Sequence, residues 1–273
     1  MKNFYGIIGN PIKHSLSPIL HNYWFNKYNI DANYSIINAG EKDIPDVIKK
    51  IKDGSLSGIN ITLPYKQKIV NYADKIINDA KITGSVNTLF LDKDKSIIGE
   101  NTDVFGLQAA YLKEIDNSLE KKALVIGAGG VSPSVILSLK KSGIKSVSIV
   151  NRTEEKCLFL KKKFNYLNIL PWKDLQSEIG NYDIIVNATS LGLKGGKDFD
   201  FEFNNCKNNA TYIDTIYNPL KTKTFKFLED KGVKVFNGLD MFIYQGQKSF
   251  YLWNKINPEI DSKLINLLLS NLK

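Results

Sequence analysis

Residue types that often carry chemistry are scarce in this chain of 273 residues. It has two cysteines, two histidines and, among 37 lysines and arginines, a single arginine. Cys157 and Cys206 are too few for a disulfide framework and lack the spacing of metal ligands, so we predict no metal site and a reducing, cytoplasmic compartment. His14 and His21 have no sequence partner that suggests a catalytic triad, and we interpret both as structural.

Long apolar runs are also absent, so no membrane span is expected. The N-terminus enters a strand at once, which predicts no signal or transit peptide. A net charge of +9 could indicate a nucleic acid partner, but the lysines are scattered beside acids, without an aromatic–basic stripe. We therefore predict neither nucleic acid nor membrane as a partner, and only mild steering of anionic ligands.

Strands and helices alternate along the chain, which predicts an α/β fold of two domains or one large domain. The strands are expected at residues 4–8, 34–37, 57–62, 86–91, 96–99, 123–126, 147–150, 183–187, 211–213 and 233–236. The helices are expected at residues 18–28, 44–52, 64–72, 103 to about 115, and 132–141, and from 239 onward with a break at 257–258.

A glycine turn follows the buried strand Ala123–Ile126 and precedes a helix. Strand, glycine turn, helix and second strand form the dinucleotide-binding unit, with a pyrophosphate at the helix N-terminus. Gly127 makes the tight turn, and Gly129 allows the backbone to approach the pyrophosphate closely. The third glycine position of the motif is occupied by Ser132, a small but imperfect substitute. The alternative is a glycine turn of a parallel sheet with no ligand.

The end of the second strand, Asn151-Arg152-Thr153, has no acid until Glu154. An NAD site usually places an Asp or Glu here to bond the ribose hydroxyl. A lone guanidinium in a lysine-rich chain indicates planar phosphate recognition instead, and the 2′-phosphate of NADP is the candidate. The alternative is a solvated loop cation.

Two serines precede the first helix. Ser15 and Ser17 are two residues apart, so in an extended loop both hydroxyls point the same way, beside helix N–H groups that favour an anion. We predict a seat for a small carboxylate, although Ser17 could also be a plain N-cap.

A lysine follows the third strand, where Asn60 and Thr62 share the polar face and Ile59 and Ile61 the other. We expect Pro64 to open a helix, with Lys66 in its first turn. At that position the helix dipole disfavours the charged form of the Lys66 side chain and favours its neutral form. Lys66 is therefore a candidate for proton transfer. The alternative is one more solvated lysine.

Eight short motifs occur along the chain in a fixed order. They are G-N-P-I-K-H-S-L-S-P at 9–18, N-I-T-L-P-Y-K at 60–66, G-S-V-N-T at 84–88, N-T-D at 101–103, G-A-G-G at 127–130, N-R-T at 151–153, N-A-T-S-L-G at 187–192 and G-L-D-M-F-I-Y-Q-G at 238–246. Such an ordered set is far more specific than any single motif. On these motifs the chain resembles the shikimate dehydrogenase family along nearly its whole length.

The resemblance implies an activity and a domain layout. The activity is the reversible, NADPH-dependent reduction of 3-dehydroshikimate to shikimate, a step of chorismate and aromatic amino acid biosynthesis. The layout is a substrate domain of residues 1–103 and 239–273 and a Rossmann-like NADP domain of residues 104–238, with the last helix returning to the first domain. The enzyme would act on a small molecule as a monomer or homodimer.

The resemblance also implies roles for individual residues. Lys66 would exchange the proton at the reacting oxygen, paired with Asp103. The substrate carboxylate would be held by Ser15, Ser17 and Tyr217, and the ring hydroxyls by Thr62, Asn87, Asp103 and Gln245. The cofactor residues would be Gly127, Ala128, Gly129, Gly130 and Val131 for the pyrophosphate, Asn151, Arg152, Thr153 and Lys156 for the 2′-phosphate, and Thr215 and Gly238 for the nicotinamide.

Three positions depart from the family pattern. Val104 occupies a position where the family usually has a glycine, Pro133 one where it usually has a basic residue, and Asp240 one where it usually has a small or neutral residue.

Two other hypotheses about the function stay open: a quinate/shikimate dehydrogenase that uses NAD, and a non-catalytic NADP-binding sensor on the same fold. Arg152 argues against the first, and the retained Lys66 and Asp103 argue against the second.

Overall fold

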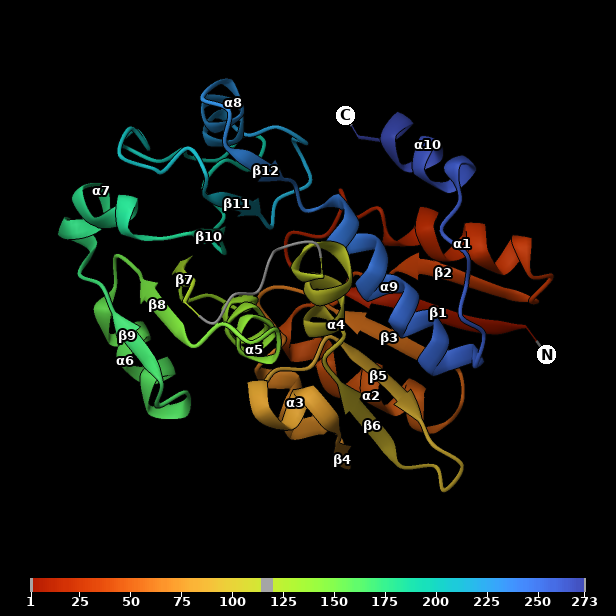
Figure 1. Ribbon diagram of the computed structural model, residues 1–273. Helices are drawn as coiled ribbons and strands as arrows, with labels where there is room; N and C mark the ends of the chain where they lie inside the picture. The colour runs from red at the N-terminus through yellow and green to blue at the C-terminus, as the bar shows by residue number, and fades with distance from the viewer. Residues whose placement is uncertain (1, 114–119, 273) are drawn as a thin grey trace. The chain divides into compact units, whose positions relative to one another are not determined.

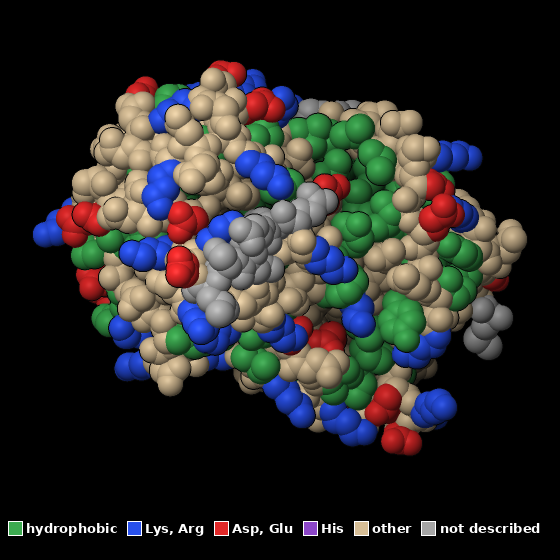
Figure 2. Space-filling view, viewed as in Figure 1, with side chains coloured by type: hydrophobic (Ala, Val, Ile, Leu, Met, Phe, Trp, Pro, Cys, Tyr) green, Lys and Arg blue, Asp and Glu red, His purple; other side chains and the backbone are tan. Residues whose placement is uncertain are grey.

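The computed structural model describes residues 2–113 and 120–272, which form two compact units (Figure 1). Within the described residues, the first unit consists of residues 2–103 and 243–271, and the second of residues 104–113, 120–242 and 272. Strands and helices alternate in both, so the predicted α/β fold is confirmed. In the described part of the chain, no helix combines the length and apolar composition needed to cross a bilayer. On the face drawn in Figure 2, the lysine and arginine side chains are spread among acidic and neutral ones.

The first unit contains a mixed six-stranded sheet. Its strands lie in the order β2-β1-β3-β5-β6-β4, where β1 is parallel to β2 and β3, and β5 is antiparallel to β3 and β6. The strands are β1 (Asn3–Ile8), β2 (Ala32–Ile36), β3 (Gly58–Ile61), β4 (Lys75–Ile76), β5 (Thr88–Leu91) and β6 (Ile97–Glu100). The strands expected at 86–91 and 96–99 are therefore present as the antiparallel pair β5 and β6.

Helices cover both faces of this sheet. They are α1 (Ser17–Lys27), α2 (Ile44–Lys52), α3 (Asn78–Thr83), the part of α9 (Leu239–Asn254) from Ile243 onward, and α10 (Ser262–Ser270), which lies beside α1 in Figure 1. As expected from the period of two, Ile59 and Ile61 join the apolar core with α2, whereas Asn60 bonds to Ser249 of α9. A side chain at Gly58 would lie 2.5 Å from the indole nitrogen of Trp253, so a glycine here lets α9 approach the sheet.

The side chain of His21, a residue of α1, is fully buried among aromatic rings that include Tyr34 of β2 and Trp253 of α9. Its ring stacks on Tyr34 with 4.5 Å between centroids and lies 5.1 Å from the ring of Trp253. Neither ring nitrogen has a hydrogen-bond partner among residues 2–113 and 120–272. Burial lowers the pKa of His21 from 6.5 to about 3, so the imidazole is neutral in the folded protein, in line with a structural role.

We expect His21→Leu to remove part of the acid sensitivity of the fold. Because the pKa of His21 is lower in the folded chain than in the unfolded one, the unfolded chain binds the extra proton between pH 6.5 and about 3. Stability therefore falls as the pH drops through this window, by about 2 kcal/mol between pH 7 and pH 5. Urea midpoints at both pH values should differ less in His21→Leu than in the wild type.

The matched control is His14→Leu, which changes the exposed histidine and should keep the wild-type pH dependence. Comparing the two pH values within each variant cancels any change in packing that the substitution causes. An undiminished pH dependence in His21→Leu would show that this imidazole does not stay neutral in the folded chain.

The second unit contains a fully parallel six-stranded sheet in the order β12-β11-β10-β7-β8-β9. The chain runs outward from β7 through β8 and β9, then restarts beside β7 at β10, so a topological switch point lies between β7 and β10. The strands are β7 (Lys122–Ile126), β8 (Ser146–Val150), β9 (Leu167–Ile169), β10 (Ile184–Asn187), β11 (Thr211–Asp214) and β12 (Lys234–Phe236). The helices between them include α5 (Ser132–Lys141), α6 (Glu154–Lys163), α7 (Leu175–Glu178) and α8 (Lys223–Asp230).

Two helix predictions need correction. No α-helix begins at Pro64, where a turn leads into the short 3₁₀ helix η2 (Lys68–Tyr72). The Lys66 carbonyl accepts a bond from the Val86 N–H at 2.8 Å instead of joining a helical ladder. The helix expected from Asp103 is α4 (Asp103–Leu107), continued by the π-helix η3 (Gln108–Leu112), and its expected end near Ile115 lies outside the described residues.

Candidate active site

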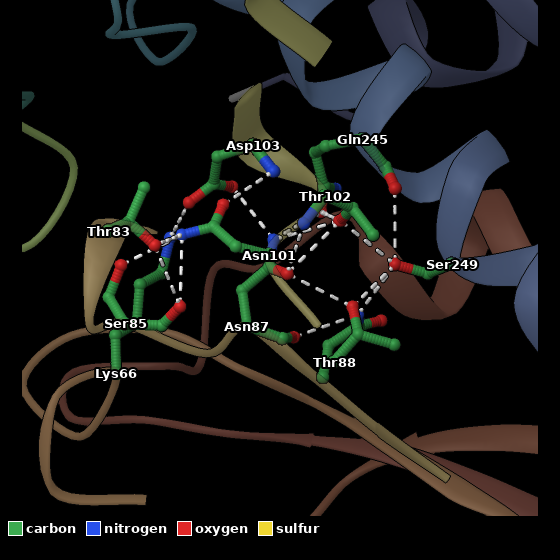
Figure 3. A network of polar contacts seen from close by, with 11 residues as sticks. Lys66, Thr83, Ser85, Asn87, Thr88, Asn101, Thr102, Asp103, Gln245 and Ser249 are labelled. Atoms are coloured by element: carbon green, nitrogen blue, oxygen red, sulfur yellow. Dashed lines mark hydrogen bonds and ion pairs between the residues drawn. The ribbon is translucent and has the colours of Figure 1, made fainter. Parts of the chain in front are cut away.

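A buried ion pair belongs to a network of polar contacts in the first unit (Figure 3). The Nζ atom of Lys66 lies 2.5 Å from Oδ2 of Asp103, and their side chains are only 11% and 6% exposed. Lys66 lies in a turn and not in a helix, so the prediction that a helix dipole favours its neutral form is wrong. The structure supplies a different reason to select it, since within the described residues the buried Lys66 ammonium donates to a single carboxylate, which leaves N–H donors for a ligand.

Asn87 aims the carboxylate of Asp103. The Oδ1 atom of Asn87 accepts the backbone N–H of Thr102 at 2.8 Å, which identifies the amide oxygen because a backbone N–H can only donate. Its Nδ2 atom therefore faces Asp103, and donates to Oδ1 at 2.8 Å. With one carboxylate oxygen held by Asn87, the other is directed at Lys66.

Hydroxyl groups of three neighbouring residues, Thr88, Thr102 and Ser249, extend the polar network beyond Asn87. The Oγ atom of Ser249 lies 2.8 Å from Thr88 Oγ1 and 3.2 Å from Thr102 Oγ1, and it donates to the Gln245 carbonyl at 3.1 Å. Figure 3 shows how these side chains meet from β5, from the residues before α4 and from α9. Ser249 was not among the predicted site residues, although its place one turn after Gln245 on the same helix is a usable signal.

Gln245 reaches the same network as Asn87. Its Oε1 atom lies 3.4 Å from Nδ2 of Asn87 and 3.5 Å from the hydroxyl of Thr102. Four predicted site residues, Lys66, Asn87, Asp103 and Gln245, are thus joined in one chain of polar contacts. A site that presents an ammonium, a carboxylate and two amides can bind a compound with several hydroxyl groups.

The two serines lie together at the start of α1. The Ser15 hydroxyl lies 3.1 Å from that of Ser17, and Ser15 Oγ accepts the Ser17 N–H at 3.2 Å. The prediction of Ser17 as the N-cap is wrong, because the N-cap is Leu16 and Ser17 is the first helical residue. Their hydroxyls converge at a helix N-terminus, which is a favourable place for an anion.

Thr62 follows β3 and lies against the loop that carries the serines. A side chain at Gly9 would lie 2.3 Å from Thr62 Cγ2, so the glycine lets the two segments meet. Asn10 adds a backbone bond to the Leu63 carbonyl at 2.8 Å. The first two sequence motifs are therefore neighbours in the fold, although about 50 residues separate them in the sequence.

The glycine turn lies after β7 in the second unit. Gly127 has a φ of +110°, and a side chain there would lie 2.7 Å from Thr189 Cγ2, so both conformation and space require glycine. The fully buried Ser132 hydroxyl accepts the Gly129 N–H and donates to the Gly127 carbonyl, both at 2.9 Å. Serine in the third motif position thus closes the turn by hydrogen bonds.

The backbone amides of this turn differ in what they can still bind. Ala128 donates to Asn151 Oδ1 at 3.2 Å, and Gly129 donates to Ser132. In the described ranges, the amides of Gly130 and Val131 have no protein acceptor. These two donors precede helix α5, so they fit the phosphate groups of a dinucleotide.

The predicted 2′-phosphate residues follow β8 at the carboxyl edge of the sheet. Arg152, Thr153 and Lys156 are exposed, and Asn151 is half-buried with its Nδ2 atom donating to the Thr153 carbonyl at 2.9 Å. Arg152 also lines a cavity of about 330 Å³. An exposed guanidinium beside a cavity, next to a glycine turn, fits a phosphorylated ribose.

Thr215 and Gly238 lie in contact in the second unit. A side chain at Gly238 would lie 2.3 Å from the Thr215 carbonyl oxygen, so only glycine allows this approach. The Thr215 hydroxyl donates to the Asn187 carbonyl at 2.9 Å. Tyr217 belongs to the same unit, where its ring lies 4.8 Å from that of Phe242.

The three departures from the family pattern have simple local surroundings. Val104 is fully buried in the apolar core of the second unit. Pro133 is buried in the first turn of α5, where its missing N–H costs no helical bond. Asp240 is exposed in the first turn of α9, where a negative charge favours the helix dipole.

Two family models match this chain. Residues 7–89 match the model described as the shikimate dehydrogenase substrate binding domain, and residues 110–193 match that of shikimate / quinate 5-dehydrogenase. The chain is also 43% identical over 268 residues to a shikimate dehydrogenase (NADP(+)) from Pelagibacter ubique, which covers 98% of this chain and 99% of that protein.

Solved structures agree with these matches. The shikimate dehydrogenase of Aquifex aeolicus is 33% identical, with a TM-score of 0.89 over 98% of this chain and 97% of that one. Shikimate 5-dehydrogenase of Thermus thermophilus, solved with NADP(H) and shikimate, is 29% identical, with a TM-score of 0.88 over all of both chains. Sequence and fold thus agree over the full length, and the chain belongs to the shikimate dehydrogenase family.

Proposed function

We propose that this chain catalyses the reversible, NADPH-dependent reduction of 3-dehydroshikimate to shikimate. The observation that carries the proposal is the buried Lys66–Asp103 pair, aimed by Asn87, in a chain of this family. The first unit would bind the substrate and the second the cofactor. Both cysteines are buried free thiols, which fits a reducing compartment, and we place the enzyme in the cytoplasm as a monomer or homodimer.

Lys66 is the residue that donates and accepts the proton at the reacting oxygen. When the ketone is reduced, negative charge develops on its oxygen, and a protonated Lys66 stabilises this charge and transfers a proton to it. In the oxidation of shikimate, neutral Lys66 accepts the hydroxyl proton. Asp103 holds the lysine in place at 2.5 Å and can accept a hydrogen bond from the same substrate hydroxyl.

The remaining residues of the first unit orient the ring. Asn87 and Gln245 present amide groups beside the ion pair, and Thr62 adds a hydroxyl at the end of β3. The hydroxyls of Ser15 and Ser17 bind the carboxylate. Because the carboxylate and the reacting hydroxyl are held by separate groups, binding and proton transfer should respond to different substitutions.

The residues of the second unit fit a bound dinucleotide phosphate. The free amides of Gly130 and Val131 would bond the pyrophosphate, while Gly127 to Gly129 shape the turn. Arg152, with Asn151, Thr153 and Lys156, would hold the 2′-phosphate, and Thr215 and Gly238 would border the nicotinamide. When bound, NADPH supplies the hydride that the reduction needs.

The direct test is product identification. Purified protein should convert 3-dehydroshikimate and NADPH into shikimate, as detected by proton NMR. Quinate with NAD should react far more slowly than shikimate with NADP, since the residues after β8, Asn151-Arg152-Thr153, include no acid that would favour NAD. Preferential oxidation of quinate with NAD would assign the chain to the alternative activity.

The carboxylate seat can be tested separately. Ser15→Ala combined with Ser17→Ala should raise KM for shikimate far more than it lowers kcat, because each lost bond to a carboxylate costs roughly 1.5–3 kcal/mol. The methyl ester of shikimate lacks the negative charge, so it should bind the wild type poorly. Its affinity for the variant should be nearly the same as its affinity for the wild type. Equal affinity of the wild type for ester and acid would remove the serines from this role.

A further inference from the structure

The cavity beside Arg152 has a second wall. This wall is the loop from Ser190 to Lys197, which follows β10, whereas Arg152 follows β8. Strands β8 and β10 flank β7, whose carboxyl end carries the glycine turn. Since the carboxyl ends of parallel strands lie at one edge of a sheet, the two walls lie on either side of that turn.

The charge of this cavity is unbalanced. Arg152, Lys194 and Lys197 line it, and no acidic side chain does so in the described ranges. None of the three forms an ion pair with a carboxylate in the part of the chain that the structure describes. The next carboxylate along the loop, Asp198, is already paired with Lys223 at 2.7 Å. Three cations that line one cavity, with no ion-pair partner among the described residues, create a positive potential that attracts an anion.

Backbone bonds fold the loop so that both lysines belong to one wall. The Gly192 N–H donates to the Lys197 carbonyl at 2.8 Å, which closes the loop, and the Lys194 N–H donates to the Asn218 carbonyl at 3.3 Å. Gly192 and Gly195 have φ values of +100° and +74°, which favour glycine. A side chain at Gly192 would also lie 2.8 Å from Thr222 Cγ2, so the base of the loop packs closely against the start of α8.

We propose that Lys194 and Lys197 form the second half of the 2′-phosphate site, opposite Arg152, and contribute to the preference for NADP over NAD. The inference rests on the proposed cofactor and adds two residues that determine its choice. A phosphate monoester carries about −1.5 to −2 charges near neutral pH and three acceptor oxygens. One guanidinium satisfies two of these oxygens, and ammonium groups can bind the remaining one as compact charges.

The pyrophosphate is a less suitable occupant of this cavity. Its donors are the free amides of Gly130 and Val131, which lie at the glycine turn and do not line the cavity. The cavity instead collects side-chain cations from the two flanking loops. The chemistry therefore favours a single compact phosphate on the ribose.

The test uses cofactor fragments, so that it does not depend on turnover. Binding of adenosine 2′-monophosphate and adenosine 5′-monophosphate is measured by isothermal titration calorimetry for the wild type and for Lys194→Gln with Lys197→Gln. The matched control is Lys173→Gln with Lys226→Gln, which removes the same charge from two exposed lysines outside the cavity. The cavity variant should bind the 2′-monophosphate about 10- to 30-fold more weakly, as expected for lost charged contacts.

The outcomes separate this inference from the proposed function. Affinity for the 5′-monophosphate should change less than about twofold, and the control should match the wild type. Equal weakening for both nucleotides, equal weakening in the control, or unchanged affinity would overturn the role of the two lysines. If shikimate proves not to be the substrate, the fragment measurement still gives its own answer, because it involves no substrate.

Discussion

Replacing Lys66 with alanine should nearly abolish turnover while shikimate still binds. The substitution removes the group that exchanges the proton at the reacting oxygen, and proton transfer of this kind contributes about 10²–10⁴ in rate. The seat formed by Ser15 and Ser17 and the amides of Asn87 and Gln245 stay in place. The measurement is kcat from steady-state kinetics together with the Kd of shikimate from calorimetry.

The buried partner of Lys66 requires a control. Removing the lysine leaves Asp103 buried without its ion-pair partner, and an unpaired buried charge costs about 3–5 kcal/mol of stability. Lys66→Ala combined with Asp103→Asn removes that charge and keeps a group of similar shape for Asn87 to contact. The double variant should fold, bind shikimate and remain as inactive as Lys66→Ala. A single variant that retains more than about a tenth of the wild-type kcat would exclude Lys66 as the proton carrier.

Replacing Arg152 with leucine should reduce the preference for NADP by a factor of about 30–150. The guanidinium grips a phosphate that NAD lacks, and a lost charged hydrogen-bond pair costs about 2–3 kcal/mol. The value of kcat/KM for NADP should fall by this factor, while that for NAD stays nearly constant. The fold should survive, because Arg152 is exposed at the end of β8 and supports no core packing.

Arg152→Lys is the matched control for charge. It keeps the cation but loses the planar fork, so its preference for NADP should lie between those of the wild type and Arg152→Leu. Equal losses for both cofactors in Arg152→Leu would mean that this residue does not read the phosphate.

Local patterns predicted the regular elements well. Helices α2 and α5 begin and end at the expected residues, since a clear apolar pattern and a proline in the first turn define both. The failures came where distant contacts decide the backbone. The turn at Lys66 depends on a bond from Val86, 20 residues further along the chain, and no local pattern reveals such a bond.

The polar network at the site was predicted only in part. Asn87 and Asp103 look ordinary by themselves, and their mutual orientation depends on the backbone N–H of Thr102. Motifs from several segments therefore had to be combined before these residues could be selected. The roles of Ser249 and Ser132 arise from three-dimensional packing, and the roles of the substrate and cofactor residues stay predictions until the variants are measured.

The central claim is that this chain oxidises and re-forms shikimate with NADP. The most direct measurement is the initial rate of nicotinamide reduction, followed by absorbance, with shikimate or quinate and with NADP or NAD in all four combinations. Shikimate with NADP should give the highest kcat/KM, and Lys66→Ala should eliminate this signal. No shikimate-dependent absorbance change with either cofactor, in protein that is folded and binds NADP, would contradict the claim.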